Sequence, residues 1–529
     1  MCCTHLNIWV KLRVLFWKTK QSITSSYDIF SCYAQTLQIE GAWRADGKGL
    51  SIWDKFAHTA LKISQDENGD IACDSYNKIA EDINSLKTLR VNHYRFSISW
   101  PRIMPDGTTR KINEAGLNYY HRLVDALLAA NIKPQVTLYH WDLPQALQDV
   151  GGWENDTIVD RFRDYADVVF NSLGDKVKFW ITINEPYNVA MVGHGYGSAA
   201  PGISFRPGTA PYIVAHNLIK AHAEAWHVYN DKYRAKHGGI VGITINSDWA
   251  EPRNPYKQED ADAALRVVQF QIGWFAHPVF NGDYSDLMKN IIRERSLAAG
   301  RPQSRLPEFT PAEVARIKGT HDYFGFNHYT TVLAYNMDYK NLEHYDADRG
   351  AGTVADRTWL DSGSFWLKVT PMGFRKILNF IKEEYGDPPI YITENGVSER
   401  GPMNLNDVHR IHYYDNYINQ ALKAYLLDGV DIRGYAAWTL MDNLEWATGF
   451  DEKFGFFYVN RSDPSLPRIP KKSVWNYATI INCNGFISPG ESPHESVAVV
   501  LLVYGIVKTS KKQKRPVKEH IDLEKKDKF

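Results

Sequence analysis

The segment VKFWITINEP, residues 177–186, decides the fold of this 529-residue chain. Its apolar, aromatic and β-branched residues are typical of a buried strand, and Pro186 ends the run. A charged side chain at the end of an apolar strand is costly to bury unless it is paired or solvated. The segment therefore indicates a strand that delivers Asn184 and Glu185 to a polar site.

Seven β-rich runs of this kind alternate with longer helical patterns. They begin at Val91 (VNHYRFSIS), Lys133 (KPQVTLYHW), Val177, Gly239 (GIVGITIN), Tyr323 (YFGFNHYT), Pro389 (PIYITEN) and Ile432 (IRGYAAWTL). Apolar residues at helical spacing mark residues 115–130, 158–169, 374–385 and 409–427. The alternation predicts a parallel sheet, and we expect an α/β fold with a single (β/α)8 TIM barrel and long βα loops.

The eighth strand that a closed barrel needs falls at residues 28–38, DIFSCYAQTLQ, which is an atypical strand sequence. No linker rich in Gly, Pro or Ser divides the alternation, so residues 28–488 are predicted to form one domain. An atypical segment, residues 1–27, precedes it. From residue 489 onward the pattern dissolves into a charged tail, which is predicted to be disordered.

The two ends of the chain bear on its location. Lys11, Arg13 and Lys18 interrupt any apolar run of a signal peptide. The apolar run at residues 497–507 would rise only about 16 Å as a helix, roughly half the hydrocarbon thickness of a bilayer. We therefore expect no full-length membrane span, and extracellular and cytoplasmic locations both stay open.

The composition indicates a small, neutral partner. The chain carries 61 basic and 61 acidic residues, so it has no net field that would attract nucleic acid or an anionic membrane. The five cysteines form no CxxC pair, and neither a zinc site nor a disulfide framework is predicted. Many aromatic rings, including 16 Trp, are available to stack on the C–H faces of sugars. The oligomeric state stays open.

Polar side chains collect at the carboxyl ends of the predicted strands. They are Arg95, His140, Asn184, Glu185, Asn246, Asn327, Tyr329, Glu394 and Asn395. In a barrel these ends converge on one face, where active sites are built. Any one of these residues could belong to an ion pair with a purely structural role. Structural ion pairs explain less readily why several polar residues share the same topological position.

Glu185 and Glu394 are the carboxylates of this set. Glycoside cleavage uses such a pair: one carboxylate attacks the anomeric carbon, while a protonated carboxyl donates to the leaving oxygen. In retaining enzymes the two groups lie ~5–5.5 Å apart. Arg95 is placed to keep one carboxylate ionised, and Tyr329 is placed to hydrogen-bond to the same carboxylate. The negative charge of this carboxylate raises the pKa of the second carboxyl. Two unrelated strand-end acids are the alternative that these residues alone leave open.

Five segments carry motifs in a recognisable order. They are Arg95-Phe-Ser-Ile-Ser-Trp100, Leu138-Tyr-His-Trp-Asp-Leu-Pro144, Asn184-Glu-Pro186, Ile392-Thr-Glu-Asn-Gly396 and Trp438-Thr-Leu-Met-Asp-Asn-Leu-Glu-Trp446. Together they resemble glycoside hydrolase family 1, from about residue 38 to residue 486, and most of all its animal lactase-like and cytosolic β-glucosidase branches. The resemblance implies that Glu185 is the general acid/base and Glu394 the nucleophile, with Arg95 and Tyr329 assisting.

The resemblance also implies which side chains meet the substrate. Positions that bind the non-reducing sugar are matched by Gln38, His140, Trp141, Asn184, Asn327, Trp438, Glu445, Trp446 and Phe454. Tyr187, Asn246 and the loop at residues 193–202 are expected to face the leaving group. The expected activity is retaining exo-hydrolysis of β-D-glucosides, without metal or cofactor. Glucose and galactose differ in the orientation of one hydroxyl, and Gln38 and Glu445 can hydrogen-bond to either orientation. The sequence therefore leaves β-D-galactosides open as a second class of substrate.

Other classes of protein predict sequence features that this chain does not show. A receptor scaffold of the klotho kind would lose a catalytic glutamate, a myrosinase-like thioglucosidase would have Gln at position 185, and a 6-phospho-β-glycosidase would replace Glu445. The loop Gly193-His-Gly-Tyr-Gly lacks the GxGxxG spacing of a phosphate cradle. His409 and His412, one helical turn apart, lack a third metal ligand nearby.

One departure from the family bears on the fold. Family 1 proteins usually enter the barrel through a strand like FxWGxATAAYQ, whereas this chain keeps Gln38 and little else. If that strand fails to form, the barrel has an open seam with two unpaired edges.

Overall fold

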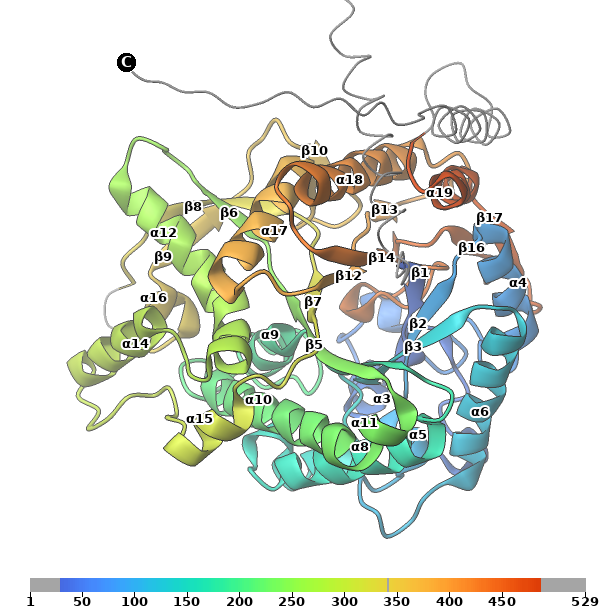
Figure 1. The fold of residues 1–529 in the computed structure, drawn as a ribbon, viewed down its shortest axis with the longest axis horizontal. Coiled ribbons are helices and arrows are strands. Elements are labelled where there is room, and N and C mark those ends of the chain that lie inside the picture. The colour runs from blue at the N-terminus through green and yellow to red at the C-terminus, as the bar shows by residue number, and fades with distance from the viewer. Residues whose placement is uncertain (1–28, 340–341, 487–529) are drawn as a thin grey trace, which may run out of the picture.

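The computed structural model describes residues 29–339 and 342–486. In this part of the chain, eight parallel strands close into a barrel, with helices between successive strands (Figure 1). In their order around the barrel, the strands are β1 (Ile29–Ala34), β14 (Ile432–Trp438), β12 (Ile390–Glu394), β7 (Phe324–Asn327), β5 (Ile240–Asn246), β4 (Phe179–Asn184), β3 (Lys133–Tyr139) and β2 (His93–Ser97). The predicted (β/α)8 barrel is confirmed.

The strand β1 closes the barrel although its sequence is atypical. It pairs in parallel with β14 on one side and with β2 on the other, and Tyr33 lies opposite Trp438 and Arg95 in the two ladders. Within the described barrel no open seam remains, because both edges are paired. The strand expected over residues 28–38 is too long. The Ile39 N–H donates to the Gln35 carbonyl over 3.1 Å, so the chain turns into the short helix α2 (Thr36–Ile39), which carries Gln38.

Helices appear within a few residues of the ranges that apolar spacing predicts. They are α6 (Glu114–Ala129), α8 (Ile158–Leu173), α17 (Pro371–Tyr385) and α18 (Val408–Leu427). In α8, Ile158, Phe162, Tyr165 and Val169 are all buried, as one apolar helix face requires. Further helices on the outside of the barrel include α4 (Ile79–Leu89), α10 (Ala210–Val228) and α19 (Lys472–Cys483) (Figure 1).

Long βα loops extend the carboxyl end of the barrel and form small sheets of their own. β6 (Trp249–Pro252) follows β5, and it pairs with β8 (Thr331–Asn336), which in turn pairs with β9 (Ala351–Val354) after β7. Likewise, β13 (Glu399–Arg400) follows β12 and pairs with β15 (Glu452–Lys453), which follows β14. The loops after neighbouring barrel strands therefore support one another.

Aromatic side chains pack the amino end of the barrel. Phe179 of β4 meets Tyr391 of β12 with ring centroids 4.7 Å apart, and Tyr323, just before β7, joins both rings. Because β5 and β7 separate β4 from β12 in the sheet, this contact crosses the barrel interior. These residues lie just before their strands or within the first two strand residues, so the amino end is filled with side chains.

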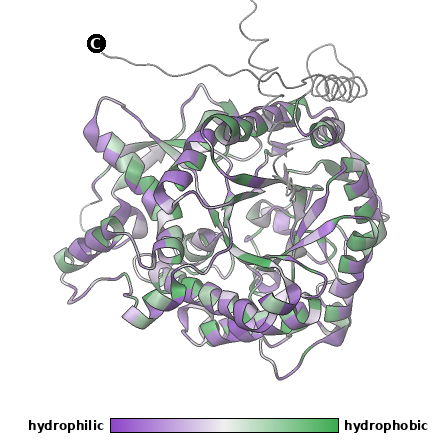
Figure 2. Cartoon of the chain, viewed as in Figure 1, coloured by the Kyte–Doolittle hydropathy of each residue, from purple (hydrophilic) through white to green (hydrophobic). Residues whose placement is uncertain are grey.

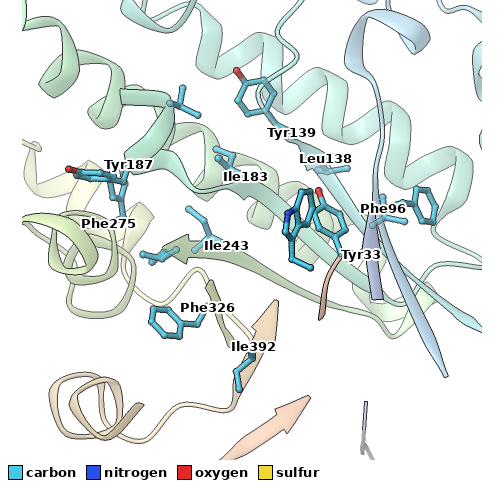
Figure 3. Close-up of a cluster of buried hydrophobic side chains, with 14 of the residues drawn as sticks. Tyr33, Phe96, Leu138, Tyr139, Ile183, Tyr187, Ile243, Phe275, Phe326 and Ile392 are labelled. Carbon is cyan, nitrogen blue, oxygen red and sulfur yellow. The ribbon is translucent and has the colours of Figure 1, made fainter. Parts of the chain in front are cut away.

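Farther along the strands, apolar side chains from separate strands converge, among them Ile183, Ile243, Phe326 and Ile392 (Figure 3). Figure 2 shows apolar residues on the barrel strands and on the surrounding helices. None of the helices within residues 29–339 and 342–486 has the length and apolar character needed to cross a bilayer. The apolar run at residues 497–507 and the charged tail lie outside the described residues. The predicted domain boundaries, 27/28 and 488/489, lie there too and stay predictions.

Candidate active site

Glu185 and Glu394 belong to one hydrogen-bonded cluster at the carboxyl end of the barrel. Glu394 is the last residue of β12 and Glu185 directly follows β4, and they are 4% and 6% exposed. Asn327, the last residue of β7, connects them. Its Nδ2 donates to Glu185 Oε1 over 2.7 Å, and its Oδ1 accepts from Oγ1 of Thr393, beside Glu394, over 2.7 Å. One amide therefore links the two strand ends.

Glu394 is held by a cation and a hydroxyl. Arg95 Nη1 donates to Glu394 Oε1 over 2.9 Å, and Tyr329 Oη donates to Oε2 over 2.8 Å. Arg95 is wholly buried and is itself fixed by donation to Thr137 Oγ1 and to the Thr393 carbonyl. Burial raises the pKa of Glu394, whereas the Arg95 charge and then the Tyr329 hydrogen bond oppose that rise. Both partners stabilise the ionised carboxylate, which is the form that a nucleophile requires.

Glu185 has neutral partners instead. Besides Asn327, Asn188 Nδ2 donates to Glu185 Oε2 over 2.7 Å. Burial, and next the negative charge of Glu394, raise the pKa of Glu185 to about 8. The cluster therefore favours a protonated Glu185 beside an ionised Glu394. Two carboxyls whose environments separate them in this way can divide acid and nucleophile between them.

A sharp backbone turn aims Glu185 into the cluster. Its φ is 48°, in the left-handed region that residues other than Gly rarely adopt. The Glu185 N–H donates to the Thr244 carbonyl of β5 over 2.9 Å, and Pro186 then begins the short helix α9 (Pro186–Asn188). The β4–β5 ladder thus reaches as far as Glu185, and it holds a turn that costs on the order of 1–3 kcal/mol in isolation.

Polar residues of the predicted sugar site form a second network beside the carboxyls. Asn184 Oδ1 accepts from Arg95 Nη2 over 2.6 Å, and Asn184 Nδ2 lies 3.0 Å from His140 Nε2. Gln38 Nε2 donates to Glu445 Oε2 over 3.4 Å, so α2 meets the loop after β14. Gln38 Oε1 is buried and accepts no hydrogen bond in the described part of the chain. Such an acceptor is suited to a sugar hydroxyl.

Aromatic residues of the predicted set lie at the same end of the barrel. Trp446 stacks on Trp141 with ring centroids 4.2 Å apart, and Trp141 Nε1 donates to the Asn184 carbonyl over 2.9 Å. Phe454 meets the ring of Tyr329 edge-on at 6.3 Å. Trp438, the last residue of β14, is buried near the barrel mouth. Their roles toward a sugar stay predictions.

The two residues expected on the leaving-group side differ in placement. Asn246 Nδ2 donates to Asn188 Oδ1 over 3.5 Å, and Asn188 donates in turn to Glu185. Tyr187 instead packs edge-on against Trp274 and is only 8% exposed. Figure 3 shows it in a cluster of buried hydrophobic side chains. The Tyr187 ring thus has the surroundings of a core residue, while Asn246 reaches the Glu185 carboxyl through two hydrogen bonds, by way of Asn188. The assignment of both to the leaving-group side stays a prediction.

Comparison with known proteins places this arrangement in a family. The model described as glycosyl hydrolase family 1 matches residues 23–486. The chain belongs to glycosyl hydrolase family 1. Lactase/phlorizin hydrolase of Homo sapiens is 68% identical over 468 residues, which cover 88% of this chain and 24% of that protein. The chain thus spans about a quarter of the length of this relative.

Shorter relatives and solved structures match over nearly their whole length. Cytosolic beta-glucosidase of Cavia porcellus is 43% identical over 455 residues, covering 85% of this chain and 96% of that protein. A solved rice Os3BGlu6 beta-glucosidase is 41% identical with a TM-score of 0.82, covering 87% of this chain and 98% of that chain. A family 1 beta-glucosidase from Humicola insolens in complex with glucose gives the same TM-score at 38% identity, covering 86% of this chain and 98% of that chain.

Three residues of this family 1 site are not singled out by the sequence patterns. Asn188 follows Glu185 by one helical turn, and that spacing is the signal that finds it. The ring of Trp366 meets Tyr329 edge-on at 5.6 Å and is partly exposed. It lies in a loop between β10 (Leu360–Asp361) and β11 (Lys368–Val369), where no periodicity marks it. Tyr33 faces the site from the atypical strand β1.

The metal site considered for His409 and His412 gains no third ligand in the structure. Both lie on α18, where His412 contacts Asn416 and His409 lies 3.9 Å from Glu399. Across residues 29–339 and 342–486, no group of three or more His, Cys, Asp and Glu side chains is arranged to hold a metal ion.

Proposed function

We propose that this family 1 domain is a retaining exo-β-glycosidase that hydrolyses β-D-glucosides by double displacement. β-D-Galactosides are the second substrate class to be tested. The observation that carries the proposal is the unequal environment of two carboxyls in one cluster. Glu394 has Arg95 and Tyr329 as partners, whereas Glu185 has two amides and a pKa of about 8.

In the first step, the ionised Glu394 attacks the anomeric carbon of the bound sugar. The bond from that carbon to the leaving oxygen breaks, and the carboxyl proton of Glu185 passes to the leaving oxygen. An alcohol departs and a covalent glycosyl ester remains on Glu394. The step requires Glu185 to be protonated and Glu394 to be charged at the same time, which is the state that their surroundings favour.

In the second step, Glu185 changes role. Ester formation removes the negative charge of Glu394, and this charge is one of the two causes that raise the pKa of Glu185. Glu185, now ionised, takes a proton from water, and the water oxygen attacks the anomeric carbon. The ester bond breaks, Glu394 recovers its charge, and the sugar leaves with its original anomeric configuration.

The sugar is proposed to lie between the polar and aromatic groups of the site. Gln38, His140, Asn184 and Glu445 supply hydrogen-bonding groups to its hydroxyls, and Trp438 supplies an apolar face. Trp141, Trp446, Phe454 and Asn327 complete the predicted set. Burial and the charges of Glu452 and Glu394 raise the pKa of Glu445, and this negative environment would repel a phosphate, which favours a neutral sugar. The proposed partner is therefore a small neutral β-glycoside.

The relatives support the reaction class. The matches include proteins named lactase/phlorizin hydrolase and cytosolic beta-glucosidase. A solved structure of a rice Os3BGlu6 beta-glucosidase mutant, 41% identical to this chain, is described as a covalent complex with Glc. A covalent sugar complex is what double displacement requires. Because the chain spans only 24% of the lactase/phlorizin hydrolase that it matches, glucoside hydrolysis by this chain is a proposal.

The test is hydrolysis of p-nitrophenyl β-D-glucoside by the purified chain, beside the Glu394→Gln variant. We expect turnover in the wild type, β-glucose as the first product seen by proton NMR, and loss of several orders of magnitude in kcat in the variant. A 2-deoxy-2-fluoro glucoside should leave a covalent sugar on the peptide that contains Glu394, detected by mass spectrometry. Full activity of Glu394→Gln would overturn the assignment of the nucleophile.

A further inference from the structure

Tyr33 contacts two residues of the proposed sugar site and Arg95, the partner of Glu394. It lies on β1 and is wholly buried (Figure 3). Its ring stacks on the His140 imidazole with centroids 5.5 Å apart and tilts against the Trp438 indole at 5.0 Å. The guanidinium carbon of Arg95 lies 3.9 Å from the centre of the same ring. Stacking and cation–π contacts of this kind fix the orientations of the groups involved.

Two hydrogen bonds hold His140 from β1 and from Gln35, the residue that follows this strand. The Tyr33 hydroxyl forms a hydrogen bond with His140 Nδ1. Two residues farther along, Gln35 Nε2 donates to the His140 carbonyl over 2.6 Å. The backbone of Tyr33 is fixed in turn, because its carbonyl accepts from the Leu440 N–H over 3.0 Å. The ring of His140 is therefore tied to β1, and its backbone to the residue directly after β1.

The neighbours of His140 determine which ring nitrogen carries the proton. A guanidinium N–H can only donate, so Arg95 Nη2, 2.6 Å from the Asn184 amide, must face the amide oxygen. The Asn184 NH2 group then faces His140 Nε2, 3.0 Å away, and Nε2 must accept. With Nε2 unprotonated, the neutral ring carries its proton on Nδ1 and donates it to Tyr33 Oη.

We propose that Tyr33 is a positioning residue that accepts the Nδ1–H proton of His140 and holds the ring so that Nε2 presents a lone pair to a hydroxyl of the sugar. The hydroxyl must then donate to Nε2, sharing or replacing the contact with Asn184. Burial and the Arg95 charge also lower the pKa of His140, which keeps the ring neutral. The inference rests on the proposed glycosidase function and adds a donor requirement at one hydroxyl of the substrate.

The variant Tyr33→Phe removes one oxygen and keeps the ring, so the stacked contacts remain. Because His140 Nδ1–H loses its buried acceptor, we expect kcat/KM for p-nitrophenyl β-D-glucoside to fall roughly tenfold, through KM more than kcat. Tyr139→Phe is the matched control. Tyr139 is also wholly buried, on the barrel strand β3, but its hydroxyl accepts from Trp153 Nε1 over 3.0 Å. This control should leave kcat/KM unchanged.

Substrate analogues test the direction of the hydrogen bond. Fluorine cannot donate a hydrogen bond, so a deoxyfluoro sugar lacks the donor just as a deoxy sugar does. At the hydroxyl that meets Nε2, both replacements should be equally damaging in the wild type, and both penalties should shrink in Tyr33→Phe. The proposal is overturned if fluorine restores kcat/KM at every sugar position where the deoxy analogue is a poor substrate. Fluorine can only accept a hydrogen bond, so His140 Nε2 would then be a donor to the sugar.

A nuclear magnetic resonance measurement tests the proposal without turnover. In protein labelled with 15N-histidine, with His140→Gln for assignment, His140 should show a protonated Nδ1, an unprotonated Nε2 and a downfield Nδ1–H proton. That proton signal should move or vanish in Tyr33→Phe and persist in Tyr139→Phe. A proton on Nε2 in the wild type would overturn the proposal even in an active enzyme. An inactive wild type with the expected Nδ1–H signal would contradict the proposed function alone.

Discussion

Arg95 Nη1 and Glu394 Oε1 lie 2.9 Å apart, and their side chains are 0% and 5% exposed. Arg95 also donates to Asn184, the residue before Glu185, so one guanidinium contacts the strand ends that carry both carboxyls. A buried charge that loses its partner is left uncompensated, which is far more costly than the loss of a surface ion pair. The charge state of the proposed nucleophile therefore depends on Arg95.

Replacing Arg95 by Met should lower kcat/KM for p-nitrophenyl β-D-glucoside by at least about a hundredfold, because the cation that stabilises the ionised Glu394 is lost. The Arg95 charge opposes the rise that burial causes in the pKa of Glu394. Without it that pKa is higher, so the acidic limb of the pH profile of kcat/KM should move to higher pH. The measurement is a full pH profile of both proteins.

Lys176→Met is the control for that experiment. Lys176 forms an ion pair of 2.6 Å with Asp125, but the two side chains are 33% and 56% exposed. Removal of this exposed pair should leave the pH profile unchanged. An acidic limb that stays in place in Arg95→Met would mean that Arg95 does not set the charge of Glu394.

Replacing Glu185 by Gln should affect substrates according to their leaving group. An alkyl or sugar alcohol needs a proton to depart, whereas p-nitrophenolate departs without one. We therefore expect hydrolysis of alkyl β-D-glucosides to fall by on the order of 10²–10⁴-fold, and formation of the glycosyl-enzyme from p-nitrophenyl glucoside to fall much less. Pre-steady-state kinetics separates that step from turnover. An equal loss for both classes of substrate would argue against Glu185 as the acid.

The pH dependence follows from the pKa of Glu185. Burial and the charge of Glu394 raise this pKa to about 8, and the first step needs the protonated form. As pH rises through about 8 the proton is lost, so kcat/KM should fall about tenfold per pH unit above that value. In Glu394→Gln one of the two causes is absent. The pKa of Glu185 should then be lower, as measured by the pH dependence of its 13C carboxyl signal.

Apolar runs that end in polar residues locate Glu185 and Glu394 from the sequence alone. The same pattern predicts Arg95 at the end of its strand, but Arg95 is the third of the five residues of β2. Strand period and hydrophobicity are local properties, and parallel strands deliver their carboxyl ends to one face of a barrel. Gln38 is also found by its motif, although its local structure is a helix and not a strand. The hydrogen bond from Ile39 to Gln35 decides that outcome.

Tyr33 is harder to find because its importance depends on contacts between distant segments. Aligned on Gln38, the family pattern FxWGxATAAYQ has Ala where this chain has Tyr33 and Gln35, so motif matching marks both only as departures. Their hydrogen bonds reach His140, more than one hundred residues away in the sequence. Trp366 likewise meets Tyr329 only through the folding of a long loop. Such pairings have no signal in local periodicity.

A buried lysine supports the loop that carries Glu445. Lys471 is fully buried, and its Nζ lies 2.8 Å from Glu399 Oε1 and 2.9 Å from Asp442 Oδ1. Asp442 precedes Glu445 by three residues, and its Oδ1 also accepts from the Gly455 N–H over 2.9 Å. Glu399 keeps a second cation, Arg410, at 3.0 Å. Loss of Lys471 therefore leaves Asp442 as the uncompensated charge.

Lys471→Met should lower the free energy of unfolding by about 3–5 kcal/mol, because one partner of a buried charge pair is removed. Urea titration measures the loss, and Lys176→Met should cost less than about 1 kcal/mol. The double variant Lys471→Met with Asp442→Asn should recover part of the stability, since the amide still accepts from Gly455 but carries no charge. If the double variant is no more stable than Lys471→Met, the loss comes from packing around the lysine stem and not from the charge on Asp442.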